Sequence, residues 1–302
     1  MKKAILLLLP FLVLSCDNES ESAPTGNYEL IGNWAPERLS RRDVWVWTPP
    51  NYDTTQTYPV LFMHDGQMLF DTAGTWNQSE WQVDETMNRL IGEGLIRPAI
   101  VVGIGNGGKY RRSDYLPTKP LNNLPDNYRD SLLDAELMGR SRADDYVKFI
   151  CFDLKPYIQE HYAASEKHSD YFLMGSSMGG LISLYTATEF PAHFGGAACM
   201  STHWPGGRDL RDTTVAKAMF EYFATHMPNP YAFKLYFDYG SKGLDAAYGP
   251  YQAVMDTIAR SQGYGASNYM SRKFDGADHN ENSWAKRLEV PLTFLLGLSP
   301  EQ

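Results

Sequence analysis

Continuous apolar runs and mixed apolar and polar stretches alternate along the chain from about Tyr28 to the C-terminus. The continuous runs are typical of strands that are buried on both faces of a parallel sheet. Strands are predicted over 44–48, 58–63, 98–104, 170–175, 194–200, 233–238 and 269–274. Helices are predicted over 80–91, 141–161, 178–188, 250–261 and 281–296. This alternation predicts an α/β domain, with a mostly parallel central sheet and helices on both faces.

Residues 105–137 form a long polar segment without a clear period, which predicts a loop of functional interest. The segment follows Gly103-Ile104-Gly105-Asn106-Gly107-Gly108, a formal match to G-x-G-x-x-G. A dinucleotide site also needs a helix at this point, and none is expected, so nucleotide binding is not predicted. Arg111 and Arg112 lie in the same segment and are candidates to contact an anionic substrate group, although a solvated loop is the simpler interpretation.

The N-terminal residues differ from the rest of the chain. Lys2 and Lys3 precede a short apolar stretch over 5–14, well below the roughly 20 residues that span a bilayer. Ser15 and Cys16 then resemble a bacterial lipobox, which predicts a lipoprotein signal peptide over 1–15 and lipidation of Cys16. An ordinary cleaved signal peptide is the alternative. An acidic tether over 16–27 and a single domain over 28–302 would follow.

Composition narrows the classes of function. The 302 residues are 43% hydrophobic, enough for one large core, and the formal net charge is −9. A nucleic-acid partner is therefore not expected. Cysteine and histidine spacing does not resemble a zinc site, and no metal or other cofactor is predicted. Cys151 and Cys199 could pair in an oxidising compartment, but two buried thiols are the favoured interpretation.

The segment Gly175-Ser176-Ser177-Met178-Gly179 matches G-x-S-x-G between a predicted strand and a predicted helix. In that context the pattern predicts the nucleophile elbow of an α/β-hydrolase fold, with Ser177 as the nucleophile. A sharp turn exposes the serine oxygen, and the helix N-terminus favours negative charge above it. Ser176 is the nearest competitor, but it occupies a position that points elsewhere.

A serine nucleophile needs a base and an acid that orients the base. In this fold they follow the serine in the order acid, then histidine. His279 lies between the last predicted strand and the last helix, where the base belongs, and His203 could line the site. Asp238 and Asp245 both follow the nucleophile near a strand end. Asp245 is favoured because a loop carboxylate can reach the imidazole.

An oxyanion hole requires two backbone N–H donors. The N–H of Met178 is one candidate, and the N–H of Gln67, in the loop that follows the strand over 58–63, is the other. Trp76, Trp81 and Trp204 are candidates to bind an aromatic or sugar ring, although Trp81 could equally be packed in the core.

These residues resemble the esterase family that includes esterase D, enterochelin-type siderophore esterases and feruloyl esterases. The resemblance rests on His64-Asp65-Gly66-Gln67, on 154–158, on 175–180, and on His279 with Trp284. It implies hydrolysis of carboxylic esters through a serine-linked acyl-enzyme, with Ser177 as nucleophile and His279 as base. The spacing from Gly240 to Asp245 is longer than in many relatives, so the resemblance does not decide the acid.

We therefore expect a serine carboxylic ester hydrolase, carried on an exported bacterial lipoprotein of the cell envelope. Its expected partners are a siderophore ester or an acylated polysaccharide, and the membrane through the lipid anchor only. Two alternatives differ in activity. One is an acyltransferase of the same fold, which needs an alcohol acceptor, and the other is a catalytically dead, glycan-binding lipoprotein.

Overall fold

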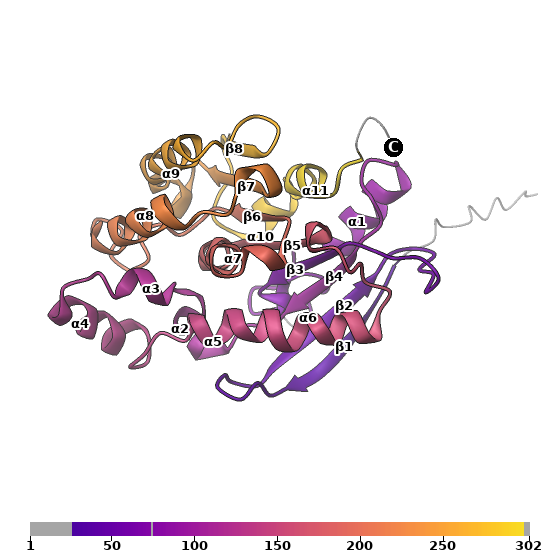
Figure 1. The fold of residues 1–302 in the computed structure, drawn as a ribbon, viewed down its shortest axis with the longest axis horizontal. Coiled ribbons are helices and arrows are strands. Elements are labelled where there is room, and N and C mark those ends of the chain that lie inside the picture. Colours follow the sequence, from indigo (N-terminus) through magenta and orange to yellow (C-terminus); the bar gives the residue numbers. More distant parts are fainter. Residues whose placement is uncertain (1–25, 74, 299–302) are drawn as a thin grey trace, which may run out of the picture.

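The computed structural model describes residues 26–73 and 75–298. Within these residues the strands form one eight-stranded sheet of order β1-β2-β4-β3-β5-β6-β7-β8 (Figure 1). β1 pairs with β2 and β2 with β4 in antiparallel fashion, and all neighbours from β4 to β8 are parallel. The strands are β1 Asn27–Trp34, β2 Arg42–Thr48, β3 Val60–His64, β4 Ile100–Ile104, β5 Tyr171–Ser176, β6 Gly196–Met200, β7 Lys234–Gly240 and β8 Tyr269–Phe274. This confirms the predicted α/β-hydrolase architecture.

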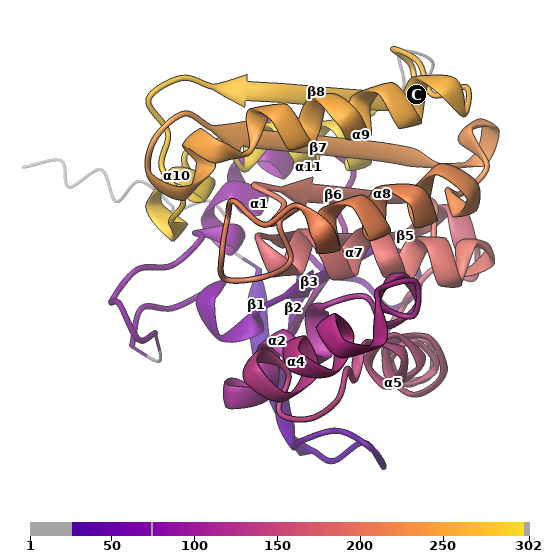
Figure 2. The same cartoon turned by 90° about the vertical axis from the view of Figure 1, so that its left-hand side faces the viewer.

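Helices cover both faces of the sheet (Figures 1 and 2). Side chains of β3 alternate between two cores: Val60 and Phe62 lie in one, Leu61 and Met63 in the other. The first core is closed by α5 Ala143–Lys148, α6 Lys155–His161, α7 Met178–Glu189, α8 Thr214–His226 and α9 Gly249–Ser261. The second is closed by α1 Val83–Gly92, α10 Glu281–Ala285 and α11 Glu289–Leu296. Both faces of each central strand are thus dry, which explains the uninterrupted apolar runs.

The segment 105–137 is not the loop that its polarity predicted. It contains η2 Gly108–Tyr110, α2 Arg111–Tyr115, α3 Thr118–Leu121 and α4 Asp126–Glu136. The helices α2, α3 and α4 each bury an apolar side chain in the first core, and α2 also buries an ion pair. Asp114 in α2 is fully buried between Arg42, at 3.0 Å, and Arg142, at 3.1 Å. The pattern of apolar positions does not reveal buried ion pairs, so the prediction of a loop over 105–137 was wrong.

Other differences lie at element ends and interruptions. The predictions omitted β1 and α8, and the helix expected over 141–161 contains a π-helical segment, η3 Phe149–Leu154. The last helix is divided into α10 and α11. Pro291 lies in the first turn of α11, where the absence of a backbone N–H costs least, so the helix restarts there.

The described residues bear on two further expectations. Cys151 and Cys199 are both buried free thiols, as favoured. None of the helices in the described ranges is long and apolar enough to cross a membrane. The predicted signal peptide, the lipidation of Cys16 and nearly all of the predicted tether lie outside the described residues.

Candidate active site

Ser177 occupies a sharp turn between β5 and α7. Its backbone has φ 58° and ψ −121°, a conformation that L-residues rarely adopt and that costs free energy unless the surroundings enforce it. The flanking glycines allow this geometry, because a Cβ atom on Gly175 would lie 2.7 Å from the backbone of Gly179. The N–H of Ser177 donates to the carbonyl of Met200 in β6, at 2.9 Å. Local sequence and neighbouring strand together hold the serine in the predicted elbow.

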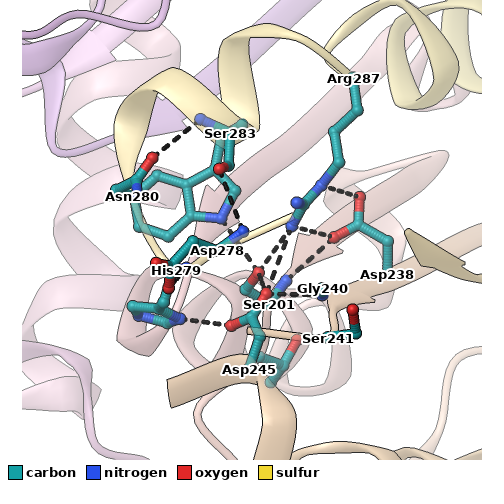
Figure 3. A network of polar contacts seen from close by, with 12 residues as sticks. Ser201, Asp238, Gly240, Ser241, Asp245, Asp278, His279, Asn280, Ser283 and Arg287 are labelled. Atoms are coloured by element: carbon teal, nitrogen blue, oxygen red, sulfur yellow. Dashed lines mark hydrogen bonds and ion pairs between the residues drawn. The ribbon is translucent and has the colours of Figure 1, made fainter. Parts of the chain in front are cut away.

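His279 and Asp245 form a close pair. His279 Nδ1 lies 2.6 Å from Asp245 Oδ1 (Figure 3). Asp245 is fully buried in the 3₁₀ turn η7 Gly243–Ala247, and its other oxygen accepts from the backbone N–H of Gly240 at 2.6 Å. Burial by itself would raise the pKa of Asp245, but hydrogen bonds from His279, Ser201 and Gly240 hold that pKa below its usual range.

Asp238, the other acid candidate, has a different partner. It lies near the end of β7, is fully buried, and accepts from Arg287 Nη2 at 2.9 Å and Nε at 3.2 Å (Figure 3). Burial raises the pKa of Asp238, and the Arg287 guanidinium opposes that rise. The structure therefore places Asp245 at the imidazole and Asp238 at a buried guanidinium.

Glycines permit the loop that carries Asp245 to approach His279. A Cβ on Gly240 would lie 2.3 Å from the carbonyl oxygen of Ala277, and one on Gly243 would lie 2.0 Å from Asp278 Oδ1. Gly243 also has φ 53°, which disfavours other residues. The long spacing from Gly240 to Asp245 accommodates the turn η7, which brings the carboxylate back against the base.

Ser177 and His279 open onto one cavity of about 320 Å³. Gln67, in η1 Gly66–Met68, lines the same cavity. Met178 is the first residue of α7, where the backbone N–H groups have no partner within the helix. The predicted nucleophile, base and oxyanion-hole candidates thus lie around the carboxyl ends of β3 and β5.

An ion pair forms another wall of this cavity. Arg111 donates to both oxygens of Asp65, from Nε and Nη2, each at 2.7 Å. Asn106 donates to the same carboxylate at 2.7 Å. Burial would raise the pKa of Asp65, but the Arg111 guanidinium holds it below its usual range. Arg111 therefore lines the cavity as one half of an ion pair without net charge, and its contact with a substrate stays a prediction.

Two candidates for substrate contact lie elsewhere. Arg112 binds Glu136 and donates to the carbonyl of Gly206 at 2.8 Å, and it is not among the cavity-lining residues. Trp204 is 0% exposed, and its Nε1 donates to Gln252 at 3.0 Å in the first core. Its assignment to substrate binding was wrong, because sequence does not show how deep the loop after β6 lies.

The other two tryptophans do line the cavity. Trp76 is 83% exposed, whereas Trp81 is buried with its ring centroid 5.4 Å from that of Trp284. The cavity thus has a packed aromatic floor and a solvent-exposed aromatic side chain, which together can contact a flat ring.

Tyr248 is a residue of the site that sequence reasoning missed. His203 Nε2 donates to the carbonyl of Gly207 at 3.0 Å, so neutral His203 accepts the phenol hydrogen of Tyr248 at Nδ1, 2.6 Å away. Burial raises the pKa of Tyr248, and the nearby Ser177 side chain opposes that rise. Burial lowers the pKa of His203 to about 4, which keeps it neutral. No spacing motif links residues 203 and 248, and only the folded chain joins them.

The described part of the chain shows no candidate metal site. No three His, Cys, Asp or Glu side chains in residues 26–73 and 75–298 are grouped so that they could hold a metal ion. The cavity brings together the hydroxyl of Ser177 and the imidazole of His279, which Asp245 contacts, and this set of groups suits acyl transfer.

Comparison with known families assigns the chain. Residues 38–295 match the esterase family described as "Putative esterase". The chain belongs to this esterase family. The match spans every strand from β2 to β8, together with Ser177, Asp245 and His279.

Individual relatives are more distant. The uncharacterized proteins YbbA and YjcH of Bacillus subtilis are 25% and 24% identical over 177 and 159 residues, which are 58% and 52% of this chain. These alignments span 62% and 54% of the two relatives themselves.

Solved structures share the fold. A ferulic acid esterase has a TM-score of 0.63 at 18% identity and covers 90% of this chain and 98% of its own. The enterobactin esterase from Shigella flexneri has a TM-score of 0.64 at 19% identity, with coverages of 90% and 61%. A feruloyl esterase module from Clostridium thermocellum, complexed with sinapinate, has a TM-score of 0.60 at 16% identity, with coverages of 89% and 88%. At these identities the likeness shows a common fold.

Proposed function

We propose that the chain hydrolyses carboxylic esters through a serine-linked acyl-enzyme, with Ser177, His279 and Asp245 as the catalytic residues. The observation that carries the proposal is the 2.6 Å contact between His279 and Asp245 at the cavity that also exposes the strained Ser177. A strained serine and a carboxylate-bound imidazole at one cavity are the parts that nucleophilic acyl transfer needs.

The first half of the reaction follows from the hydrogen bonds. Asp245 holds the proton of His279 on Nδ1, so Nε2 is free to accept the hydroxyl proton of Ser177. The Ser177 hydroxyl donates to Nε2 when an ester occupies the cavity. Ser177 Oγ then attacks the carbonyl, and the N–H groups of Met178 and Gln67 stabilise the oxyanion.

The second half returns the enzyme to its starting state. The imidazolium of His279 protonates the departing alkoxide, which leaves the acyl group on Ser177. Water then gives a proton to His279 and attacks the acyl carbon, which releases the acid and restores the hydroxyl. The balance requires only ester and water, so no cofactor takes part in these steps.

The proposed substrate is an ester outside the cytoplasm, either a siderophore ester or an acylated polysaccharide. The N-terminal residues Lys2, Lys3 and Cys16 support an exported lipoprotein, held at the cell envelope by its lipid. The cavity supports a ring-bearing ester, because Trp76 and Trp81 stand beside polar groups from Asn106 and Gln67. Ferulic acid and enterobactin are named in the titles of esterases with the same fold.

Fluorophosphonate labelling tests the proposed mechanism. The wild-type chain should be labelled and should hydrolyse p-nitrophenyl acetate, whereas Ser177→Ala should do neither. Ser176→Ala is the matched control, since it removes the neighbouring hydroxyl and should leave labelling intact. Equal labelling of Ser177→Ala and wild type would contradict the proposal. Feruloyl, acetyl-sugar and catecholate ester panels then rank the substrate classes.

A further inference from the structure

A buried polar network lies behind the His279–Asp245 pair, and the mechanism above does not use it (Figure 3). It joins Ser201 just after β6, Asp238 in β7 and Arg287 between α10 and α11. Ser201 and Asp238 are fully buried, and Arg287 is 3% exposed. We propose that Ser201 and Arg287 are positioning residues, which orient the Asp245 carboxylate and, with Asp238, set the charge beside the base. This inference rests on the proposed serine mechanism.

The direction of the Ser201 hydrogen follows from its partners. Ser201 Oγ accepts from Trp284 Nε1 at 3.0 Å and from Arg287 Nη2 at 2.7 Å. These two donors occupy both acceptor positions of the hydroxyl oxygen. Its single hydrogen is therefore directed to the remaining neighbour, Asp245 Oδ2, at 2.5 Å. Ser201 cannot turn away without leaving a buried donor unpaired, which is costly.

This arrangement fixes the plane of the Asp245 carboxylate. Oδ2 accepts from Ser201 and from the N–H of Gly240, while Oδ1 faces His279 Nδ1. A carboxylate that is anchored on one oxygen presents the other in a single direction, and hydrogen bonds in a buried site resist reorientation. Ser201 thus acts on the base through Asp245. Its backbone, with φ 41°, is held by bonds from its N–H to the carbonyl and Oδ1 of Asp238.

Arg287 places charge in the same network. Its Nη2 lies 2.9 Å from Asp238 Oδ1 and 3.7 Å from Asp245 Oδ2. Two buried carboxylates therefore share one guanidinium, and the cluster keeps one net negative charge for the imidazolium that forms at His279. Asp238 matters because it engages Arg287 with two hydrogen bonds, which prevents the guanidinium from neutralising Asp245 alone.

Removal of the Ser201 hydroxyl tests the positioning role. Ser201→Ala should lower kcat for p-nitrophenyl acetate roughly tenfold to a hundredfold, as expected when a hydrogen bond to a charged group is lost, with KM unchanged. Ser113→Ala is the matched control, because this buried hydroxyl donates to the carbonyl of Leu137 instead. The low-field proton resonance of His279 Nδ1–H gives a readout without turnover, and it should move in Ser201→Ala only.

Two charge variants test the electrostatic role: the first changes the net charge of the cluster, and the second restores it. In Asp238→Asn the Arg287 guanidinium pairs with Asp245 alone, which disfavours the imidazolium of His279. The acid limb of the pH profile of kcat/KM should therefore move to lower pH by roughly half a unit or more. In Asp238→Asn combined with Arg287→Gln, Asp245 again leaves the cluster with one net negative charge, so the limb should return toward its wild-type position. The other charged or titratable groups near the pair stay unaltered: Arg111, His203, Tyr248, Asp278 and Glu281.

The outcomes separate this inference from the proposed function. If wild type hydrolyses the ester through Ser177, a displacement of the acid limb to lower pH in Asp238→Asn that the double variant reverses supports the positioning role. No displacement in Asp238→Asn, an equal displacement in both variants, or a Ser201→Ala variant with wild-type kcat and an unmoved resonance, would overturn it. Wild-type hydrolysis that persists in Ser177→Ala would instead refute the proposed function on which it rests.

Discussion

The two sides of the active cavity are built differently. On the acid side, Asp245, Ser201 and Arg287 are at most 3% exposed, and their hydrogen bonds interlock. On the opposite side, Arg111 is 29% exposed in its side chain and Trp76 is 83% exposed. Water is excluded from the buried side, so charge interactions are strong there. The open side can accommodate substrates of different shapes. We infer that reaction type is set on the first side and substrate choice on the second.

The largest expected effect comes from Asp245, the proposed triad acid. Asp245→Asn keeps the shape of the buried side but replaces the acceptor at His279 with a group that favours the wrong tautomer, so kcat should fall by about 10⁴. Asp278→Asn is the control, because the Asp278 carboxylate accepts a hydrogen bond from the backbone N–H of His279 and not from its ring. Steady-state kinetics with p-nitrophenyl acetate measure both. A fall of less than tenfold in Asp245→Asn would remove Asp245 from the triad.

The second-largest expected effect is a loss of folding stability at acid pH. The folded pKa of His203, about 4, lies below the ordinary value of 6.5, so below pH 6.5 the unfolded chain binds a proton that the folded protein excludes. Stability from this site is complete above pH 6.5 and falls as the pH drops toward 4, by about 3 kcal/mol in all. Urea unfolding at several pH values measures the slope.

His203→Gln should flatten that slope, whereas His168→Gln, which alters an exposed histidine, should leave it unchanged. Part of the slope should persist in His203→Gln, because burial also lowers the pKa of His64 to about 3. An identical slope in wild type and His203→Gln would show that His203 does not stay neutral in the fold.

On the open side, Asp65 should have a smaller effect. Asp65→Asn removes the charge that holds Arg111 at two 2.7 Å contacts, which loosens the loop before Gln67. The value of kcat/KM for a neutral ester should fall about tenfold, in line with one lost charged hydrogen bond. The freed guanidinium should favour an anionic ester over its neutral analogue. Asp153→Asn removes an exposed carboxylate of η3, and it should change neither kcat/KM for the neutral ester nor the preference between the two esters.

The smallest expected effect belongs to Trp76. Trp76→Ala should raise KM roughly threefold to tenfold for feruloyl or sugar esters, as expected for the loss of one ring contact, while kcat stays constant. Small acetyl esters should be unaffected because they do not reach the exposed ring. Tyr231→Ala, which removes a side chain that is 93% exposed at a different cavity, serves as the control. A change in kcat with constant KM would place Trp76 in the chemistry rather than in substrate choice.

The comparison of the two sides also explains what sequence could predict. Ser177 and His279 could be proposed from sequence because their positions follow from local order: strand, turn and helix around the serine, and the last strand before the histidine. Asp245 could only be favoured over Asp238, since both follow the same strand. Trp204 was misplaced because composition does not reveal whether a loop residue faces a cavity or the core.

The sequence by itself determined the parallel sheet, the elbow and the chemical class, because apolar runs and glycine spacing act over a few neighbouring residues. The tertiary structure alone decided which acid reaches the base, and it brought Tyr248 to His203 and Arg287 to Asp238. Those contacts join residues 34 to 49 positions apart. They depend on burial and on the packing of separate strands and helices, and no local pattern encodes either.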